Sequence, residues 1–357
     1  MKRYYNLDGI RTLATIGILF MHVKVNIGYE IVSAEQSNSV IRFILEELIG
    51  SAGVLVPLFF MISGFSLCCG YYEKIKNNQM NIFDFYKKRY LRILPYFAIL
   101  TLLDIASQII FSHKLDNSSL YEGFANITLF FGFLSNANIQ VIGVAWSLGV
   151  IFSFYIIFPF FVATVWNKKI AWFSFVVSLG LNFICNVYFK IGDIPDKANF
   201  VKWLCFFYAG ALLFLYKDCI TKQYMKFSQK INIVLSILFV ISGIIIGQLL
   251  PVSNQFSGTF VDWKQLIGFA IVLLGAMGRR NALLSNCFTS YISNISFEIY
   301  LAHMFVFRIV EKLGIISMLG KTLGSYIAIS VIVFVLVSLF ASVYKRIEKK
   351  TYKIANK

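Results

Sequence analysis

The chain has 357 residues, of which 58% are hydrophobic and 14% are charged, and its mean hydropathy is +0.73. Soluble domains carry about 25% charged residues, so this composition excludes an ordinary soluble domain. The formal net charge of +16 is typical of nucleic-acid-binding proteins, but charge that is concentrated on one side of a membrane has another explanation.

Apolar runs near twenty residues long recur along the whole chain. As helices they are long enough to cross a hydrocarbon core about 30 Å thick. The predicted spans are 9–27, 51–71, 92–111, 145–165, 170–189, 200–216, 231–250, 265–277, 290–310 and 323–344. We therefore predict an all-α, polytopic transmembrane bundle of about ten spans, with one transmembrane domain over 1–345 and a basic cytoplasmic tail over 346–357.

The Lys and Arg residues are unevenly divided between the two sides that this topology creates. The side that holds the N-terminus carries more than twice as many of them as the opposite side. The positive-inside rule then predicts that both termini are cytoplasmic. The excess charge mainly orients the chain in the cell (plasma) membrane, so we expect membrane lipids as partners and no nucleic acid.

The first predicted span contains two ionisable residues, Arg11 and His22, eleven positions apart. Eleven steps of about 100° place both on one helix face, about 16 Å apart along the axis. A charge at the centre of a membrane helix costs about 2.5–3.5 kcal/mol on insertion scales, so such residues usually face protein, water or a ligand. The alternative is a snorkelling Arg11 and an ordinary hydrogen-bonded His22. Asp8 is close enough in sequence to pair with Arg11.

The predicted cytoplasmic loop 72–92 ends in a basic segment that contains Arg89 and Arg92. These two residues are i, i+3 neighbours and share a face if they lie in the first turn of a helix. Two guanidinium groups at the inner membrane edge suit a phosphate or pyrophosphate ligand. Contact with anionic lipid headgroups is the simpler alternative, and position alone favours it.

The late span 290–310 carries Glu298, His303 and Arg308. Glu298 lies near the middle of the span and must be protonated, paired or turned toward a cavity, because a bare carboxylate there is expensive. His303 falls in the outer half, where it lines the cavity of His22 or packs against a neighbouring helix. Arg308 is expected to snorkel to the outer surface.

Two further stretches and the cysteines complete the local predictions. Residues 124–134 are apolar but too short to cross, so they lie at the outer surface or re-enter the membrane. The GxxxG pattern from Gly243 to Gly247 predicts close helix packing. The six cysteines form no CxxC pair or Cys/His cluster, so no metal site is expected.

Five segments, in order along the chain, resemble the acyltransferase-3 family of membrane acyltransferases. They are Leu7-Asp8-Gly9-Ile10-Arg11 continuing to His22, Pro57–Phe65, Arg89-x-x-Arg92 with Ile-Leu-Pro, Trp146-Ser147-Leu148 with Phe154-Tyr155, and Ile295–His303 with its Tyr300. The resemblance covers almost the whole chain. It implies a bacterial membrane O-acetyltransferase that moves an acyl group, usually acetyl, from cytoplasmic acyl-CoA to a hydroxyl of a cell-surface or lipid-linked polysaccharide.

The resemblance also implies roles for the residues in these segments. Arg89 and Arg92 would hold the phosphates of acetyl-CoA, and His22 would act as general base or accept the acyl group itself. Arg11, positioned by Asp8, would orient the cofactor or polarise the thioester. The residues left as acceptor or cavity candidates are Trp146, Ser147, Glu298, Tyr300 and His303. Ser147 is otherwise a helix cap. Whether the chain forms a homodimer is left open.

One position departs from the family pattern, and two other functions remain open. Ile151 stands where the family often has Glu, which leaves any role of that carboxylate unfilled. A membrane-bound O-acyltransferase of another type would use His303 with Asn281 or Asn294, but would leave Arg11, His22 and the arginine pair unexplained. A glycolipid transporter or flippase suits the intramembrane charges, yet the chain shows no paired half-repeat with broken helices.

Overall fold

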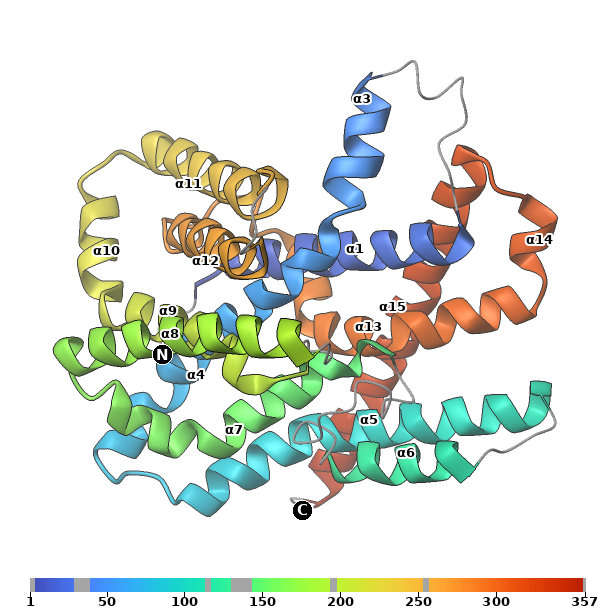
Figure 1. Ribbon diagram of the computed structural model, residues 1–357, viewed down its shortest axis with the longest axis horizontal. Helices are drawn as coiled ribbons and strands as arrows, with labels where there is room; N and C mark the ends of the chain where they lie inside the picture. Colours follow the sequence, from blue (N-terminus) through green and yellow to red (C-terminus); the bar gives the residue numbers. More distant parts are fainter. Residues whose placement is uncertain are drawn as a thin grey trace.

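A computed structural model describes residues 4–28, 39–112, 117–129, 143–192, 198–252 and 257–355, and these residues contain helices and no strand. The long helices, shown in Figure 1, are α1 (Asn6–Ile27), α4 (Val56–Lys76), α5 (Ile82–Ser112), α7 (Trp146–Thr164), α8 (Lys168–Gly192), α9 (Phe200–Leu215), α11 (Gln229–Ile244), α12 (Ser257–Ala276), α13 (Cys287–Lys312) and α15 (Leu323–Ala355). Shorter helices are α3 (Ser39–Arg42), α6 (Asn117–Thr128), α10 (Lys217–Met225) and α14 (Ile315–Leu319). Single turns of π or 3₁₀ helix cover Phe43–Ile49, Ala52–Leu55, Gly143–Ala145 and Ile245–Leu249.

The all-α, membrane-spanning architecture predicted from the sequence is confirmed. Among the described residues, 8 helices are long and apolar enough to cross a membrane, or up to 9 if α9 and α10, bent by 55°, form one span. The predicted span 290–310 coincides with α13, which is 26 residues long but too polar to join that count. Polar residues in α13 are therefore the reason that hydropathy alone undercounts the long helices.

The direction of α13 fits its place as a further crossing. Asp8, at the start of α1, accepts a hydrogen bond from Ser293 near the start of α13, and His22 near the end of α1 contacts His303 farther along α13. The two helices therefore run parallel. The first and ninth of ten alternating crossings must do so.

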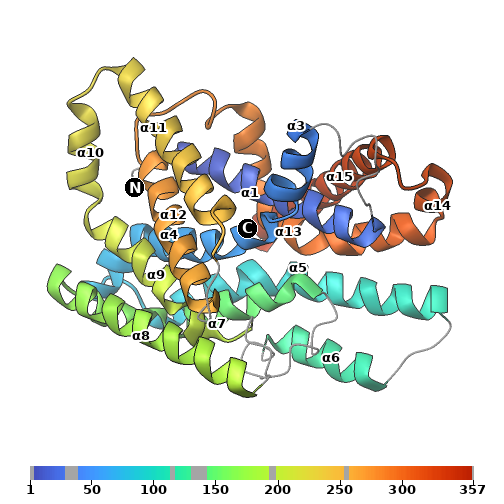
Figure 2. The same cartoon turned by 45° about the horizontal axis from the view of Figure 1, so that its top comes forward.

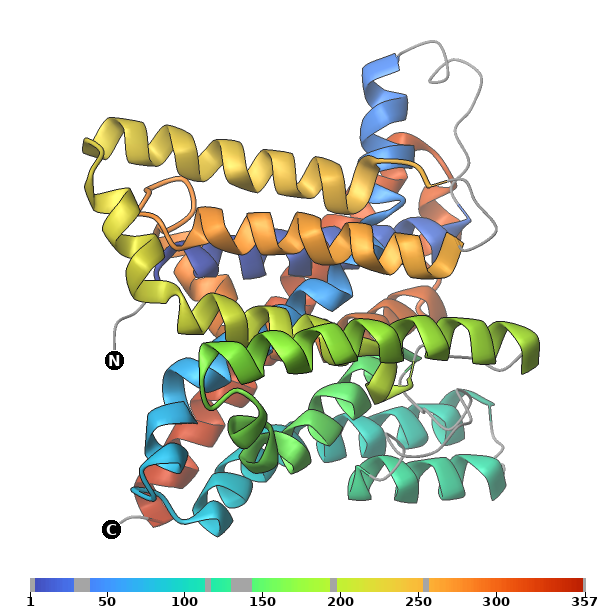
Figure 3. The ribbon, with the colours of Figure 1, turned by 60° about the vertical axis from the view of Figure 1, so that its left-hand side comes forward.

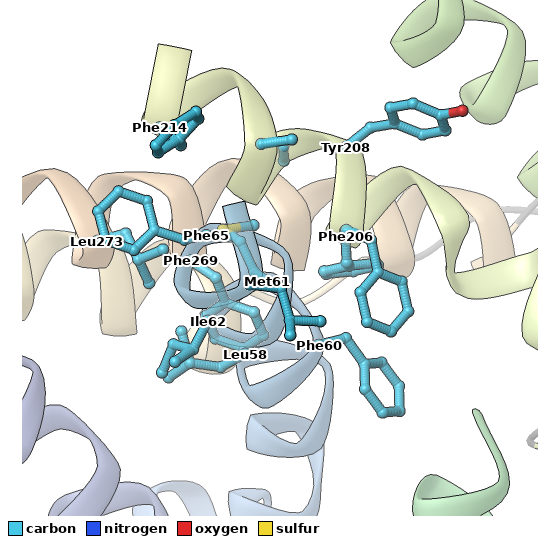
Figure 4. Packing of buried hydrophobic residues seen from close by; sticks show 14 of the residues in the cluster. Leu58, Phe60, Met61, Ile62, Phe65, Phe206, Tyr208, Phe214, Phe269 and Leu273 are labelled. Carbon is cyan, nitrogen blue, oxygen red and sulfur yellow. The ribbon is translucent and has the colours of Figure 1, made fainter. Parts of the chain in front are cut away.

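An apolar half of the bundle is built from α4, α7, α9 and α12. Figure 4 shows Phe60, Met61 and Phe65 of α4 directed at aromatic side chains of α9 and at α12. The backbones of α4 and α9 approach so closely that a Cβ on Gly64 would lie 2.4 Å from the Phe207 carbonyl oxygen. In the same interface Phe60 stacks on Phe207, and Tyr72 meets Phe214 edge-on.

The predicted close packing at the GxxxG pattern is confirmed between α11 and α12. Figure 3 shows α11 and α12 side by side along most of their length. A Cβ on Gly243 would lie 2.5 Å from the Gly268 carbonyl oxygen of α12, so this crossing needs small residues on both helices.

Three predicted boundaries differ from the observed ones. The loop 72–92 is shorter than predicted, because α4 extends to Lys76 and α5 already begins at Ile82. The basic residues before 92 are good helix formers and continue the membrane helix by about three turns. Beside α5 lies α6 (Figure 2), which takes up the first part of 124–134, and the part beyond 129 falls outside the described residues. α15 continues through 345–346 without a break.

Candidate active site

A cavity of about 230 Å³ lies between α1, α4, α5, α7 and α13. Four predicted site residues line it, each from a different helix: Arg11, Arg92, Ser147 and Tyr300. Its other lining residues are Val56, Phe59, Phe60, Ile62, Ser63, Ile93, Ile151, Tyr155, Ser293, Ser296 and Phe297. The cavity is thus mainly apolar, with two guanidinium groups and several hydroxyls directed into it.

The start of α1 is held against α13 and the segment before it. Asp8 accepts hydrogen bonds from Ser293 at 3.0 Å and from Ser290 at 3.3 Å. A Cβ on Gly9 would lie 2.4 Å from the Leu284 carbonyl oxygen, so the Asp-Gly pair combines a polar anchor with a close backbone approach. Asp8 therefore fixes the rotation of α1 on α13, and the predicted pairing of Asp8 with Arg11 stays a prediction.

Arg11 projects from this anchored turn to the cavity wall. Its Nη2 donates a hydrogen bond to Ser66 Oγ of α4 at 3.1 Å. The side chain is therefore directed across the bundle, where it lines the cavity.

A buried carboxylate stands behind the second cavity arginine. Glu298 is 1% exposed, and its Oε1 lies 3.5 Å from Arg92 Nη1 and 2.8 Å from Lys345 Nζ of α15. Glu298 is therefore paired, which was one of the alternatives for it. Lys345 is the closer of the two cations and also lies 2.7 Å from Glu348, whereas the Arg92 side chain is 39% exposed and lines the cavity.

Arg89 lies one layer away from the cavity. Its Nη2 donates to the Tyr71 hydroxyl at 2.7 Å, and its guanidinium lies 5.7 Å from the centre of the Tyr155 ring, which lines the cavity. The two arginines are thus in neighbouring positions, but Arg92 alone of the pair reaches the cavity wall.

The two predicted histidines form a direct pair. His303 Nε2 lies 3.1 Å from His22 Nδ1. His303 is 1% exposed, whereas His22 is partly exposed. Neither histidine ring lines the cavity. Tyr300, which does line it, links the histidine pair to the cavity, because its carbonyl oxygen lies 2.7 Å from His303 Nδ1.

The hydrogen bonds of this pair define the tautomer of both rings. A carbonyl oxygen only accepts, so the Nδ1 facing Tyr300 O in His303 and the Nδ1 facing Ile18 O in His22 (3.0 Å) both carry protons. Neutral His303 then accepts the same His22 Nδ1–H with its Nε2 lone pair, so this one proton is shared between His303 and Ile18 O. The lone pair of His22 is consequently on Nε2, and His303 orients the ring that carries it.

Two residues at the start of α7 have different surroundings. Ser147 Oγ lies 2.9 Å from the Tyr300 hydroxyl and donates to Val144 O. The cap alternative for Ser147 is wrong, because it is the second residue of α7 and Ala145 occupies the cap position. Trp146 packs on Phe60 and Trp203 in the apolar half and does not line the cavity.

A family model described as an acyltransferase domain matches residues 4–343. The chain belongs to the acyltransferase-3 family. It is therefore a multi-pass membrane acyltransferase. Comparisons with curated proteins and with solved structures gave no match.

The other acyltransferase mechanism considered from the sequence is not supported by the geometry of this family member. Asn281 is held by Asn6 at the start of α1, about 24 Å along that helix from His22 and therefore far from His303. Asn294 is exposed and lies about 13 Å before His303 on α13. Neither asparagine is placed to orient the His303 ring.

Two features of this acyltransferase were missed or misjudged in the sequence. Lys345 is the last residue of the predicted transmembrane domain, and nothing in the local sequence signals its contact with Glu298. Arg308 does not simply snorkel, because its Nη1 lies 3.3 Å from Asp104, a carboxylate of α5 that is 2% exposed. The signal for that pair was present, since an Asp within a predicted span requires a partner.

Proposed function

We propose that this acyltransferase moves an acetyl group from cytoplasmic acetyl-CoA to a hydroxyl of a cell-surface or lipid-linked polysaccharide. The observation that carries the proposal is the pairing of His22 with the buried His303, next to a cavity with two arginines. A partly exposed imidazole oriented by a second group is the arrangement expected of a general base.

The donor would enter from the side of Arg89 and Arg92. Guanidinium groups bind phosphate oxygens through two parallel hydrogen bonds, which suits the diphosphate of acetyl-CoA. Arg92 at the cavity would bind it directly, with Arg89 beside it. Since Lys345 supplies the nearest positive charge to Glu298, Arg92 retains donors for the ligand.

The arm of the donor would then run along α1. Arg11 and His22 lie about 16 Å apart on one helix face, too far for both to act on one carbonyl group. Of its two suggested roles, Arg11 therefore suits orienting the donor better than polarising the thioester. The extended pantetheine arm would bridge this distance and bring the thioester to His22.

At the far end, His22 would act on the acceptor. Its Nε2 would take the proton from the sugar hydroxyl while the oxygen attacks the thioester carbonyl. The carbon–sulfur bond breaks, the coenzyme leaves as thiolate, and the imidazolium returns the proton to sulfur. An acetyl group carried briefly on His22 Nε2 gives the same products in two steps.

The direct test is transfer by the purified full chain in lipid vesicles. Labelled acetyl-CoA is supplied with candidate polysaccharide acceptors, and acetyl ester formation is measured. We expect His22→Ala to abolish transfer, while His113→Ala, which removes the remaining histidine of the chain, retains it. Movement of the acceptor across the membrane without acetylation would support a transporter instead.

A further inference from the structure

A second hollow lies at the end of the bundle where α1 begins, which is the predicted cytoplasmic side. It has a volume of about 620 Å³ and shares no lining residue with the central cavity. Three helix junctions meet around it: the end of α4, the start of α8, and the bend between α9 and α10. Its lining residues are Tyr72, Glu73, Lys76, Trp166, Asn167, Lys168, Lys169, Phe214, Leu215, Lys217 and Asp218.

The lining carries more positive than negative charge. Four lysines stand against two acidic residues, which leaves an excess of two positive charges. One of the acids, Asp218, has a side chain that is 83% exposed and lies 3.9 Å from Lys217, so it neutralises little of the interior. The hollow is therefore suited to an anion with two negative charges.

Fixed groups hold the positive charge in place. Lys76 Nζ donates to the Trp166 carbonyl oxygen at 3.1 Å, and Lys217 Nζ lies 3.9 Å from the centre of the Phe214 ring. The 25-residue helix α8 begins at Lys168, a lining residue, so the positive end of its helix dipole lies at the hollow. The lysine side chains and the N-terminal end of the helix dipole thus both make the potential in the hollow more positive.

The surroundings of the hollow indicate a lipid rather than a soluble anion. Trp166 on its wall is 46% exposed, and the adjoining face of α8 exposes Trp172 (47%), Phe173 (71%) and Val176 (60%). Exposed tryptophans are typical of the membrane interface, and the apolar face beyond them is suited to acyl chains. An anionic headgroup and its chains would both be matched on one continuous surface.

We propose that this pocket binds the headgroup of an anionic phospholipid with two phosphate groups, whose acyl chains lie along α8. Basic pockets between helices at the inner membrane edge are the usual sites for such headgroups. This inference does not depend on the acyl donor or acceptor proposed above.

The test measures lipid binding to the purified full chain in a neutral detergent by native mass spectrometry. The ligands are diphosphatidylglycerol, phosphatidylglycerol and phosphatidylcholine. The pocket variant is Lys168→Gln with Lys169→Gln, and the control is Lys349→Gln with Lys350→Gln, which removes two exposed lysines from α15. Equal thermal midpoints would show that both variants are folded.

We expect diphosphatidylglycerol to bind best to the unmodified chain and about tenfold more weakly to the pocket variant, with the control unchanged. Equal binding by the pocket and control variants would overturn the proposal. So would pyrophosphate binding as tightly as the lipid, which would indicate a soluble anion. Displacement of the lipid by coenzyme A would assign the hollow to the acyl donor and would also overturn it.

Discussion

Two helix interfaces of this membrane protein are held together by different kinds of contact: α4 packs on α9 through apolar groups, and α1 packs on α13 through polar ones. In the first, glycines and stacked rings bring backbones into contact, as at Gly64 and Phe207. In the second, polar side chains pair across the helices, as in Asp8 with Ser293 and His22 with His303. The apolar interface fixes the scaffold, while the polar interface positions the groups suited to chemistry.

His303 would act on the reaction only by orienting His22. Among such positioning residues, we expect its substitution to lower the activity most. His303→Leu removes the acceptor that His22 Nδ1–H has on α13 and leaves only the Ile18 carbonyl oxygen of its own helix, so we expect kcat to fall roughly 10–100-fold. His303→Gln, whose amide oxygen can still accept, should recover part of the rate. Equal loss in both variants, with normal thermal midpoints, would argue against an orienting role.

In the apolar interface, Gly64→Ala should destabilise the fold without altering the chemistry. The added Cβ would meet the Phe207 backbone, which cannot move aside as a side chain would, and we expect a loss of about 1–3 kcal/mol. The control is Gly180→Ala in α8, where a Cβ meets nothing within 4 Å. Thermal unfolding in detergent checks both variants, and an unchanged midpoint for Gly64→Ala would contradict the close approach.

Lys345→Met tests whether Lys345, rather than Arg92, is the main cation paired with Glu298. Without the ammonium, the carboxylate would draw Arg92 toward itself, and we expect the KM for acetyl-CoA to rise about tenfold, or roughly 1.4 kcal/mol. Lys345→Arg should retain the ordinary KM, and adding Glu298→Gln to Lys345→Met should restore it. A fall in kcat alone would assign Lys345 another role.

The smallest effect is expected at the cavity hydroxyl of Tyr300. Tyr300→Phe removes a neutral hydrogen bond to Ser147, so we expect kcat/KM to fall about fivefold, corresponding to about 1 kcal/mol. A loss above about 100-fold would instead place this hydroxyl in the proton transfer.

The sequence predicted the helices of both interfaces, because long apolar runs and ionisable residues inside them are local signals. The family resemblance named Arg11 and Tyr300 as separate candidates, and only the structure brings them to one cavity. The pairing of Lys345 with Glu298 was missed because it joins residues far apart in the chain. The predicted start of α5 was too late. The basic residues before Arg92 lower the local hydropathy, although they are still part of the helix.

In the proposed mechanism, donor binding near the start of α1 is separated along that helix from proton transfer at His22. The most direct test of this separation compares kcat and KM for acetyl-CoA in Arg92→Gln and His22→Gln, with the same acceptor and vesicles. We expect a raised KM with nearly normal kcat for Arg92→Gln, and a kcat lowered about 10²–10⁴-fold with normal KM for His22→Gln. A change in the same kinetic constant in both variants, or full turnover by His22→Gln, would show that the two steps are not separated in this way.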